Sequence, residues 1–228
     1  MQPGHAAEPP RFAPIVSLDG EAPGRSALFA MEVAGHGEAH VRLACAVGAL
    51  ISAYQAHRGR PVAMMVSLSR EELERVELRS LAAALDDAGV PPELLMIRVP
   101  RYAAGASDPL LDRVTATGVN VVVANLIVAP GQTAQLAGAP VDMVELPPDL
   151  VDEIDRTPEA AGRVDEWMAL AHRIDWLVLA RNVRRPSQAR ELSRLGCDLA
   201  AGPLMGAPVD PTTLGFGGEA AARSRLAG

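Results

Sequence analysis

Eight short apolar runs, separated by segments of helical periodicity, constrain the fold of this chain more than any other feature. They cover residues 14–18, 27–33, 62–68, 94–99, 119–126, 143–146, 176–180 and 199–201. Nearly continuous apolar runs such as Val121-Val122-Val123 are typical of strands buried on both faces. Eight strands with helices between them predict an α/β protein of the (β/α)8 TIM-like barrel type.

Helix signals occur between these runs. Ser69 and Glu72 form a capping-box pattern, in which the serine hydroxyl accepts a hydrogen bond from a backbone N–H of the first turn. Apolar residues at helical spacing follow from Leu73 to Leu85, and Gly89 can adopt the left-handed conformation that ends a helix. These signals predict a single helix across this segment.

Three more helices are expected from similar signals. One covers about residues 41–57, and another begins at Thr157-Pro158, where proline suits the first helical position. The third follows Pro186 and ends at Gly196. Together with the strand-like runs they account for a single domain from residue 11 to 210. Residues 1–10 and 211–228 are rich in Gly, Pro and small polar residues, and we expect both tails to be flexible.

Composition excludes several classes of protein. The net charge of −7 argues against a nucleic-acid binder, which needs clustered Lys and Arg. Two cysteines are too few for a disulfide framework, and we expect Cys197 to be a buried thiol. The sequence has no apolar stretch long enough to span a bilayer and no signal-peptide pattern. We therefore expect a cytoplasmic protein that binds neither nucleic acid nor membrane.

Short motifs at fixed spacing suggest a family. Along the chain they are Ala13-Pro14-Ile15, Ser26-Ala27-Leu28, Ser67-Leu68-Ser69, Arg98-Val99-Pro100-Arg101, Ala124-Asn125, Pro140-Val141-Asp142, Glu145-Leu146-Pro147, Ala180-Arg181-Asn182-Val183-Arg184 and Leu195-Gly196-Cys197-Asp198. In this order they resemble the QPI, EAL, NxS, ExTE, DD, PVD, KID, AEGVE and LGCD motifs of EAL domains, the cyclic di-GMP phosphodiesterases. The resemblance extends over about residues 11–208.

The resemblance implies further details of the fold. EAL barrels begin with an antiparallel strand, and Asp19-Gly20 fits a turn between the first two strands. The segment between Ala30 and the helix at 41–57 is short for the family, so a lateral helix beside the active-site mouth is expected to be missing. Pro140-Val141-Asp142, Leu195-Gly196-Cys197-Asp198 and Leu170-Ala171-His172 are kept, and we expect them to serve packing and turns.

The resemblance also implies that the catalytic chemistry is lost. EAL hydrolysis uses metal ions held by carboxylates and an asparagine, and hard divalent cations prefer anionic oxygen ligands. Here the matching positions are Ser26, Ser67, Arg98, Ala124, Asn125 and Arg181. A guanidinium stays protonated and repels a cation. We therefore expect no catalytic residue, no metal and no cofactor.

Two interpretations of the remaining charged residues stay open. Arg98, Arg101, Arg181, Arg184 and Glu145 all follow strand ends. They could form an anion pocket, since arginine suits phosphate and carboxylate. Alternatively Glu145 pairs with Arg98 or Arg181 and plugs the former cavity, which we favour because buried charges are normally paired. The candidate ligand-binding residues are Ser26, Ser67, Arg98, Asn125, Glu145 and Arg181.

Histidines offer weaker candidates. His36 and His40 have the i, i+4 spacing of metal ligands on a helix, but neighbouring glycines disfavour a helix there and no third ligand is evident. We interpret both as surface residues. His172, in a kept motif, is expected to pack or to cap a helix.

We therefore expect an inactive EAL-like domain that regulates bacterial signalling through contact with an unidentified regulatory protein, with a homodimer as one form. Its contact surface is expected around residues 30–40. The alternative is a metal-free receptor for cyclic di-GMP or another anion. Cyclic di-GMP binding is not expected, because Ala13 and Ala30 replace residues that contact the nucleotide in the family.

Overall fold

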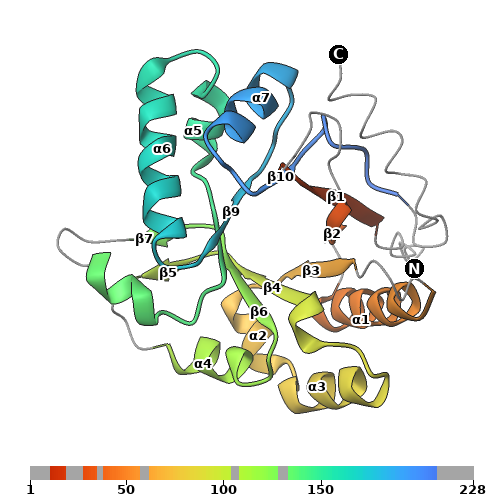
Figure 1. Cartoon of the computed structure of the whole chain (residues 1–228). Coiled ribbons are helices and arrows are strands. Elements are labelled where there is room, and N and C mark those ends of the chain that lie inside the picture. The colour runs from red at the N-terminus through yellow and green to blue at the C-terminus, as the bar shows by residue number, and fades with distance from the viewer. Residues whose placement is uncertain are drawn as a thin grey trace, which may run out of the picture.

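The computed structural model describes residues 11–18, 28–34, 38–56, 62–103, 108–127 and 133–209. The predicted tails, at 1–10 and 211–228, lie outside these residues, as do Ser26, His36 and the Asp19-Gly20 turn. Within the described residues the chain forms a closed eight-stranded barrel with helices around it (Figure 1).

The barrel strands confirm the predicted α/β barrel. They are β1 (Arg11–Ser17), β2 (Leu28–Ala34), β3 (Ala63–Ser67), β4 (Leu95–Val99), β6 (Asn120–Val123), β8 (Met143–Glu145), β9 (Leu177–Ala180) and β10 (Leu199–Ala201), in the closed order β1-β10-β9-β8-β6-β4-β3-β2. The predicted antiparallel first strand is confirmed, since β1 is antiparallel to both β2 and β10. The other neighbouring pairs are parallel.

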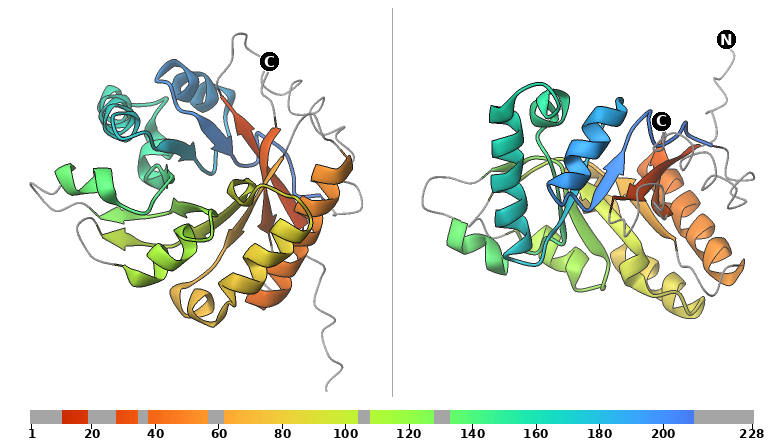
Figure 2. Two further views of the ribbon diagram at one scale, coloured as in Figure 1. Left: turned by 60° about the horizontal axis from the view of Figure 1, so that its bottom comes forward. Right: turned by 45° about the horizontal axis from the view of Figure 1, so that its top comes forward.

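The helices lie outside the barrel. They are α1 (Ala39–Ala56), α2 (Arg70–Arg75), α3 (Leu78–Asp87), α4 (Pro109–Thr115), α5 (Pro148–Glu153), α6 (Pro158–His172) and α7 (Pro186–Arg194), with 3-10 turns η1 (Pro92–Leu94) and η2 (Thr133–Gly138). Figure 2 shows α1 and α3 on one side of the barrel and α6 and α7 on the other. None of the described helices is long and apolar enough to cross a membrane.

The predicted single helix between Ser69 and Gly89 was wrong. Ser69 and Glu72 do form the capping box, with Glu72 N donating to Ser69 Oγ at 3.2 Å and Ser69 N to the Glu72 carboxylate at 2.8 Å. The helix ends at Arg75 because Val76 is extended, and α3 restarts at Leu78. This break lets Leu78 reach the core together with Leu81 and Leu85. The helix stops at Gly89 and Gly196 are confirmed, since both glycines have positive φ.

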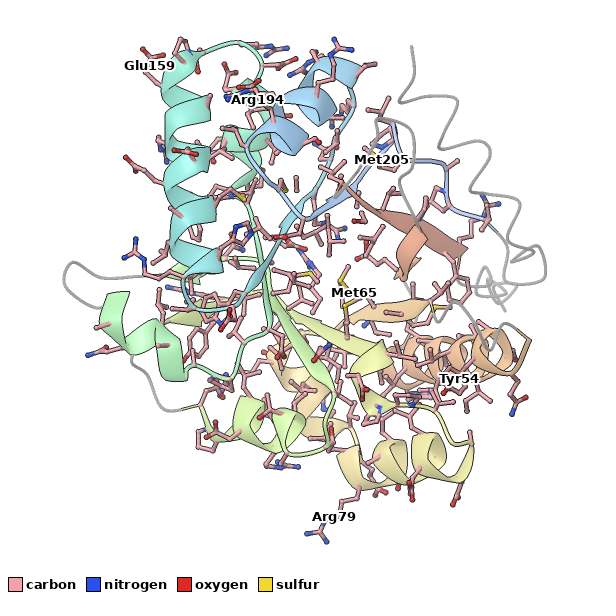
Figure 3. The ribbon with its side chains drawn as sticks, in the orientation of Figure 1. Tyr54, Met65, Arg79, Glu159, Arg194 and Met205 are labelled. Atoms are coloured by element: carbon pink, nitrogen blue, oxygen red, sulfur yellow. The ribbon has the colours of Figure 1, made fainter. Side chains whose placement is uncertain are left out.

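Two apolar layers hold the barrel together. The larger one packs the outer faces of the strands against the helices, and Cys197 belongs to it, 1% exposed as predicted. The smaller one fills the lumen and consists of Ile15, Ala63, Met65, Met96, Val122, Met143, Leu179, Leu199 and Ala201. Figure 3 shows Met65 pointing into the barrel. Arg79, at the bottom of the view, and Glu159, at the top, lie on outer helices and point away from the barrel.

The kept motifs contain two aspartates that join neighbouring strands, a more specific role than the packing and turns that we expected from the sequence. Asp142, just before β8, accepts a hydrogen bond from Val121 N of β6 at 2.7 Å. Asp198, just before β10, accepts one from Val178 N of β9 at the same distance. Asp198 also lies 3.0 Å from Nε2 of His172, the last residue of α6. The two carboxylates thus accept hydrogen bonds from backbone N–H groups near the N-terminal ends of the strands. The candidate site lies at the other end of the barrel, where the strands end.

Candidate functional site

Strand alternation places a second layer of side chains above the lumen. In a strand, residues two apart face the same side. Met65, Met96, Val122, Met143 and Leu179 face the lumen, so the residues two positions later face its mouth. These are Ser67, Arg98, Ala124, Glu145 and Arg181. Three of them, Arg98, Glu145 and Arg181, come together with Glu32 of β2, and we call these four residues the mouth cluster.

The strongest contact in the mouth cluster joins β4 to β8. Arg98 Nε donates to Glu145 Oε1 at 2.6 Å, and Arg98 Nη2 donates to Glu145 Oε2 at 2.8 Å. This two-pronged geometry is the strong form of an arginine–carboxylate pair. The predicted pairing of Glu145 is therefore confirmed.

Arg181 links the two carboxylates. Its Nη2 lies 2.8 Å from Oε2 of Glu32, and its Nη1 lies 3.5 Å from Oε1 of Glu145. Ser67 connects the same groups: its hydroxyl donates to Glu32 Oε1 at 3.2 Å and accepts from Arg98 Nη1 at 3.5 Å. The expected convergence of Arg98, Arg181 and Glu145 is thus confirmed, with Ser67 beside them.

The mouth cluster is a neutral and largely buried ionic network. Glu145 and Glu32 are 6% and 11% exposed, and Arg98 and Arg181 are 22% and 31% exposed. Burial opposes the charged form of Arg98, but its hydrogen bonds to Glu145 and the charges of both glutamates outweigh burial and raise the pKa of Arg98. The formal charges of the four side chains cancel, because two arginines face two glutamates.

The residues at the mouth do not fit a catalytic metal ion. Such an ion needs several oxygen ligands. Both carboxylates here already contact guanidinium groups, which would repel a cation at the same place. Within the described ranges, no three His, Cys, Asp or Glu side chains gather so that they could hold a metal.

The position assigned to Ser26 needs correction. Ser26 lies outside the described residues, and the β2 side chain that faces Ser67 and Arg181 is Glu32. Glu32 is also the β-ladder partner of Ala13, which stands at the glutamine of the QPI motif. From this strand pairing we assign the glutamate of the EAL motif to Glu32 rather than to the position of Ser26.

Asn125 does not join the other candidates. Ala124 holds the inward position on β6, so Asn125 points away from the mouth, where its Nδ2 donates to Pro100 O at 2.9 Å. Tyr102 N donates to Asn125 O at 3.1 Å. These bonds support a small parallel sheet of β5 (Tyr102–Ala103) and β7 (Leu126–Ile127) beyond the ends of β4 and β6. Asn125 thus has a structural role.

The remaining candidates lie away from the mouth cluster. The side chains of Arg101 and Arg184 are exposed and make no contact with the cluster. His40 is exposed and lies 3.3 Å from Glu38. This agrees with the interpretation of His40 as a surface residue.

A hollow of about 510 Å³ opens beside the mouth cluster, and we call it the side hollow. Its walls come from β1 and from the loops after β9 and β10, and include Pro14, Pro203 and Pro208. Glu32, Arg181 and Asn182 are its polar groups. Arg181 therefore belongs both to the neutral cluster and to an accessible cavity.

A larger groove of about 850 Å³ lies between α6 and α7, outside the barrel. Several of the charged side chains around it are paired: Arg194 donates to Glu191 at 2.5 and 2.9 Å. Asp155 accepts from Arg185 at 2.6 and 2.9 Å and from the Ser187 hydroxyl at 2.5 Å. Because this groove lies outside the barrel, away from the strand ends that form the mouth, the mouth and the side hollow are the better candidate site.

The sequence of residues 38–208 matches the EAL domain family model. The chain belongs to the EAL domain family. No curated protein is detectably similar to it in sequence. The family match begins after β2, so the assignment of Glu32 rests on the strand pairing alone.

Solved EAL structures share the fold at low sequence identity. The EAL domain of Mycobacterium smegmatis DcpA is 20% identical, with a TM-score of 0.73 over 98% of this chain and 97% of that one. The Xanthomonas citri FimX EAL domain, solved with c-diGMP, is 14% identical, with a TM-score of 0.74 over 91% and 90%. A standalone EAL protein from Vibrio cholerae O395, solved with c-di-GMP, is 15% identical, with a TM-score of 0.67 over 91% and 95%.

Proposed function

We propose that this EAL domain does not hydrolyse cyclic di-GMP and regulates bacterial cyclic di-GMP signalling through contact with another protein. The observation that carries the first half is the mouth cluster. Arg98 and Arg181 stand where the family has glutamates, and Glu145 stands where it has lysine. Similar EAL structures contain cyclic di-GMP, which connects the fold with this signalling system.

The geometry of the mouth cluster opposes hydrolysis. Metal-dependent hydrolysis of a phosphodiester requires a metal-activated water and neutralisation of the phosphate charge. The acceptor oxygens of Glu145 are both engaged by Arg98, and those of Glu32 by Arg181 and Ser67. A metal would have to displace guanidinium groups from both carboxylates. Neither glutamate is therefore available as a metal ligand or as a general base.

A direct assay tests the loss of hydrolysis. The purified protein is incubated with cyclic di-GMP and Mg²⁺ or Mn²⁺, and the linear dinucleotide is measured. We expect no product above a control without enzyme. Turnover that disappears in the Glu32→Gln variant would contradict the proposal, because it would show that Glu32 can leave Arg181 and act on the substrate.

The regulatory half of the proposal rests on family analogy, since a fold does not give a function. An EAL domain whose reactive carboxylates are neutralised retains its outer surface for contacts. Affinity purification from the source cell should recover a protein partner that forms a defined complex with the purified chain. Light scattering on the chain alone tests the homodimer. If no partner is recovered and the chain is a monomer, the regulatory role is wrong.

One observation favours a second function, a metal-free receptor. The side hollow adjoins Arg181, whose side chain remains 31% exposed. An anionic ligand could use that guanidinium, although Glu32 beside it opposes negative charge. Titration calorimetry with cyclic di-GMP separates the two functions. Saturable micromolar binding would favour the receptor, and no heat of binding favours the protein-contact role.

A further inference from the structure

The outer side of α1 differs from that of the other described helices. Each of α2 to α7 exposes Asp, Glu or Arg side chains to solvent, whereas α1 exposes none of these residue types. The one arginine of α1, Arg42, turns inward: its side chain is 14% exposed, and its Nη2 lies 2.9 Å from the Glu72 carboxylate. A helix without a charged side is normally covered by other structure. The uncharged outer side of α1 therefore points to a contact.

The exposed residues of α1 lie on one side of the helix. After His40 in the first turn they are Val41, Ala44, Gly48, Ser52 and Gln55, and we call these five residues the α1 face. Steps of three and four residues keep them together. Val41 is 42% exposed, one of the large hydrophobic side chains that the fold leaves open to solvent. The Ser52 hydroxyl donates to Gly48 O at 2.8 Å, so its donor is already satisfied within the helix.

Gly48, at the centre of the α1 face, is not required by the fold of its own molecule. An added Cβ at this position would meet no atom within 4 Å, and no positive φ holds the residue there. Glycine inside a helix lowers its stability relative to alanine. Its other use is to let a second backbone approach closely. The position of Gly48 therefore indicates an approach from outside the molecule.

The sizes of the side chains along the α1 face fit a crossing helix. Two crossing helices are closest at one point and diverge on both sides of it. The central residues, Ala44, Gly48 and Ser52, are small, whereas Val41 and Gln55 at the two ends are larger. Small residues at the crossing point allow a short distance between the helix axes, and larger ones fill the space where the helices diverge.

The same face on a second molecule meets these requirements. An uncharged surface is matched by another uncharged surface, since a charge buried against it would lack a counterion. Among the described helices, α1 alone presents such a face. A two-fold axis at Gly48 would place each Ala44 opposite the Ser52 of the other copy, as a self-complementary contact requires.

We propose that two copies of this chain associate through their α1 faces, with the helices crossing at Gly48. The surface lies on the outside of the barrel (Figure 1), and the inference goes beyond the proposed function without resting on it. The 18 residues of α1 extend over about 27 Å. With a helix width of about 10 Å, the contact covers a few hundred Å² per copy, less than the ~800 Å² of a standard interface. The dimer should therefore be weak and dependent on concentration.

Self-association of the purified full chain tests this proposal. Sedimentation velocity between about 10 and 500 µM, the range expected for a small interface, should show a rising average mass. Because the α1 face carries no charge, NaCl should not weaken the association. In ¹⁵N-labelled protein the amide resonances of Val41, Ala44, Gly48 and Ser52 should shift with protein concentration. The resonance of Ala83, at an exposed position on α3, should not.

Two glycine variants separate a contact between molecules from an effect within the helix. Gly48 and Gly162 are both helical and exposed, and in both an added Cβ meets no atom within 4 Å. Alanine at either position should raise the urea midpoint of the dilute protein, because alanine favours a helix. Only Gly48→Ala should also weaken self-association, by about 10-fold, because its methyl group lies at the crossing point.

A charge on the α1 face gives the stronger test. Ala44→Glu places a carboxylate in the contact and should abolish self-association, whereas Ala83→Glu on α3 should not change it. A chain that stays monomeric up to about 500 µM overturns the proposal. Association that Gly48→Ala and Ala44→Glu leave unchanged, or that NaCl weakens, overturns it too, because the contact would then lie on another or an ionic surface. If the chain is monomeric but a recovered protein partner covers α1, the second copy is wrong while the regulatory function stands.

Discussion

At the residue scale, the mouth cluster consists of two arginines and two glutamates that pair with one another. Each arginine faces a carboxylate, and Arg181 reaches both of them. Buried ion pairs stabilise a fold little compared with apolar residues of the same shape, but removing one partner leaves a buried charge alone. Replacing one charged residue of the mouth cluster should therefore lower the free energy of unfolding.

Replacing Glu145 should reveal this most clearly. Glu145→Gln keeps the shape but leaves Arg98 without its anionic partner, so we expect a loss of about 3 kcal/mol in the free energy of unfolding by urea denaturation. The control is Asp149→Asn, where the carboxylate is 67% exposed and lies 3.8 Å from Arg163. It should cost less than about 1 kcal/mol. Equal effects of both changes would show that the cluster is well hydrated.

Sequence reasoning found part of this site. Arg98, Glu145 and Arg181 could be predicted because the resemblance to the family places each of them near the C-terminal end of a strand. Glu32 was missed because the EAL motif was matched by its letters to the Ala-Leu pair at residues 27–28. The register between the first two strands, which places Glu32 opposite Ala13, was not considered. A usable signal was present: Glu32 is the only charged residue in the apolar run at 27–33. Asn125 was misplaced because alternation gives the inward position to Ala124.

At the element scale, the turn between α5 and α6 is fastened to the start of α7. Arg185 donates to both Asp155 carboxylate oxygens, and Ser187 donates to one of them. Gln188 adds a bond of 2.7 Å from its Nε2 to Val151 O and accepts from Arg184 N and Arg185 N. These contacts hold the loop after β9, which begins with Arg181, so the turn helps to position the mouth cluster.

This fastening should depend on pH. The hydrogen bond from Arg185, opposed by burial and aided by Ser187, holds the pKa of Asp155 well below its usual range. A carboxyl with a lowered pKa in the folded state contributes stability above its unfolded pKa, near 4, and loses it as the pH falls toward the folded value. The Asp155→Asn variant should therefore be less stable than wild type at neutral pH. The difference should shrink below about pH 4 in urea titrations. A constant difference across that range would mean that the charge of Asp155 is unimportant.

Gly202 limits the loop after β10 in another way. Its φ is 143°, and an added Cβ would overlap the backbone N and O of Val183. Gly202→Ala should therefore destabilise the protein by at least about 2 kcal/mol in thermal or urea unfolding. In Gly162→Ala the new Cβ meets no atom within 4 Å, and alanine in a helix should stabilise by up to about 1 kcal/mol. If both variants behave alike, the close approach at Gly202 is relieved by a small backbone shift.

Sequence reasoning predicted the barrel strands better than the position at which a helix is interrupted. All eight strand-like runs became barrel strands, because each is largely apolar and short. The division between α2 and α3 could not be predicted, because Val76 fits the helical spacing and only packing reveals that Leu78 needs a new start. The short sheet of β5 and β7 was also missed, since two-residue strands carry no periodicity.

At the scale of the whole molecule, the barrel and the mouth have separate supports. The lumen layer is apolar, and the mouth cluster provides its own counterions. The two arginines of the mouth cluster balance its two glutamates without a bound cation. A ligand that binds only the folded state raises the apparent stability of a protein. Because the mouth cluster needs no cation, we expect divalent metal ions not to bind there and not to change the stability of this protein.

Thermal unfolding with and without divalent metal measures this independence. A metal present at a hundredfold excess over its dissociation constant would stabilise the fold by about 2.7 kcal/mol. For a domain of this size that raises the melting temperature by about 5 to 10 °C. We expect no shift with millimolar Mg²⁺ or Mn²⁺ beyond that of NaCl at equal ionic strength, because Arg98 and Arg181 already occupy the faces of both glutamates. A metal-specific rise that is lost in Glu32→Gln would show that a cation displaces Arg181, and the neutral cluster would then be only one of two states of the mouth.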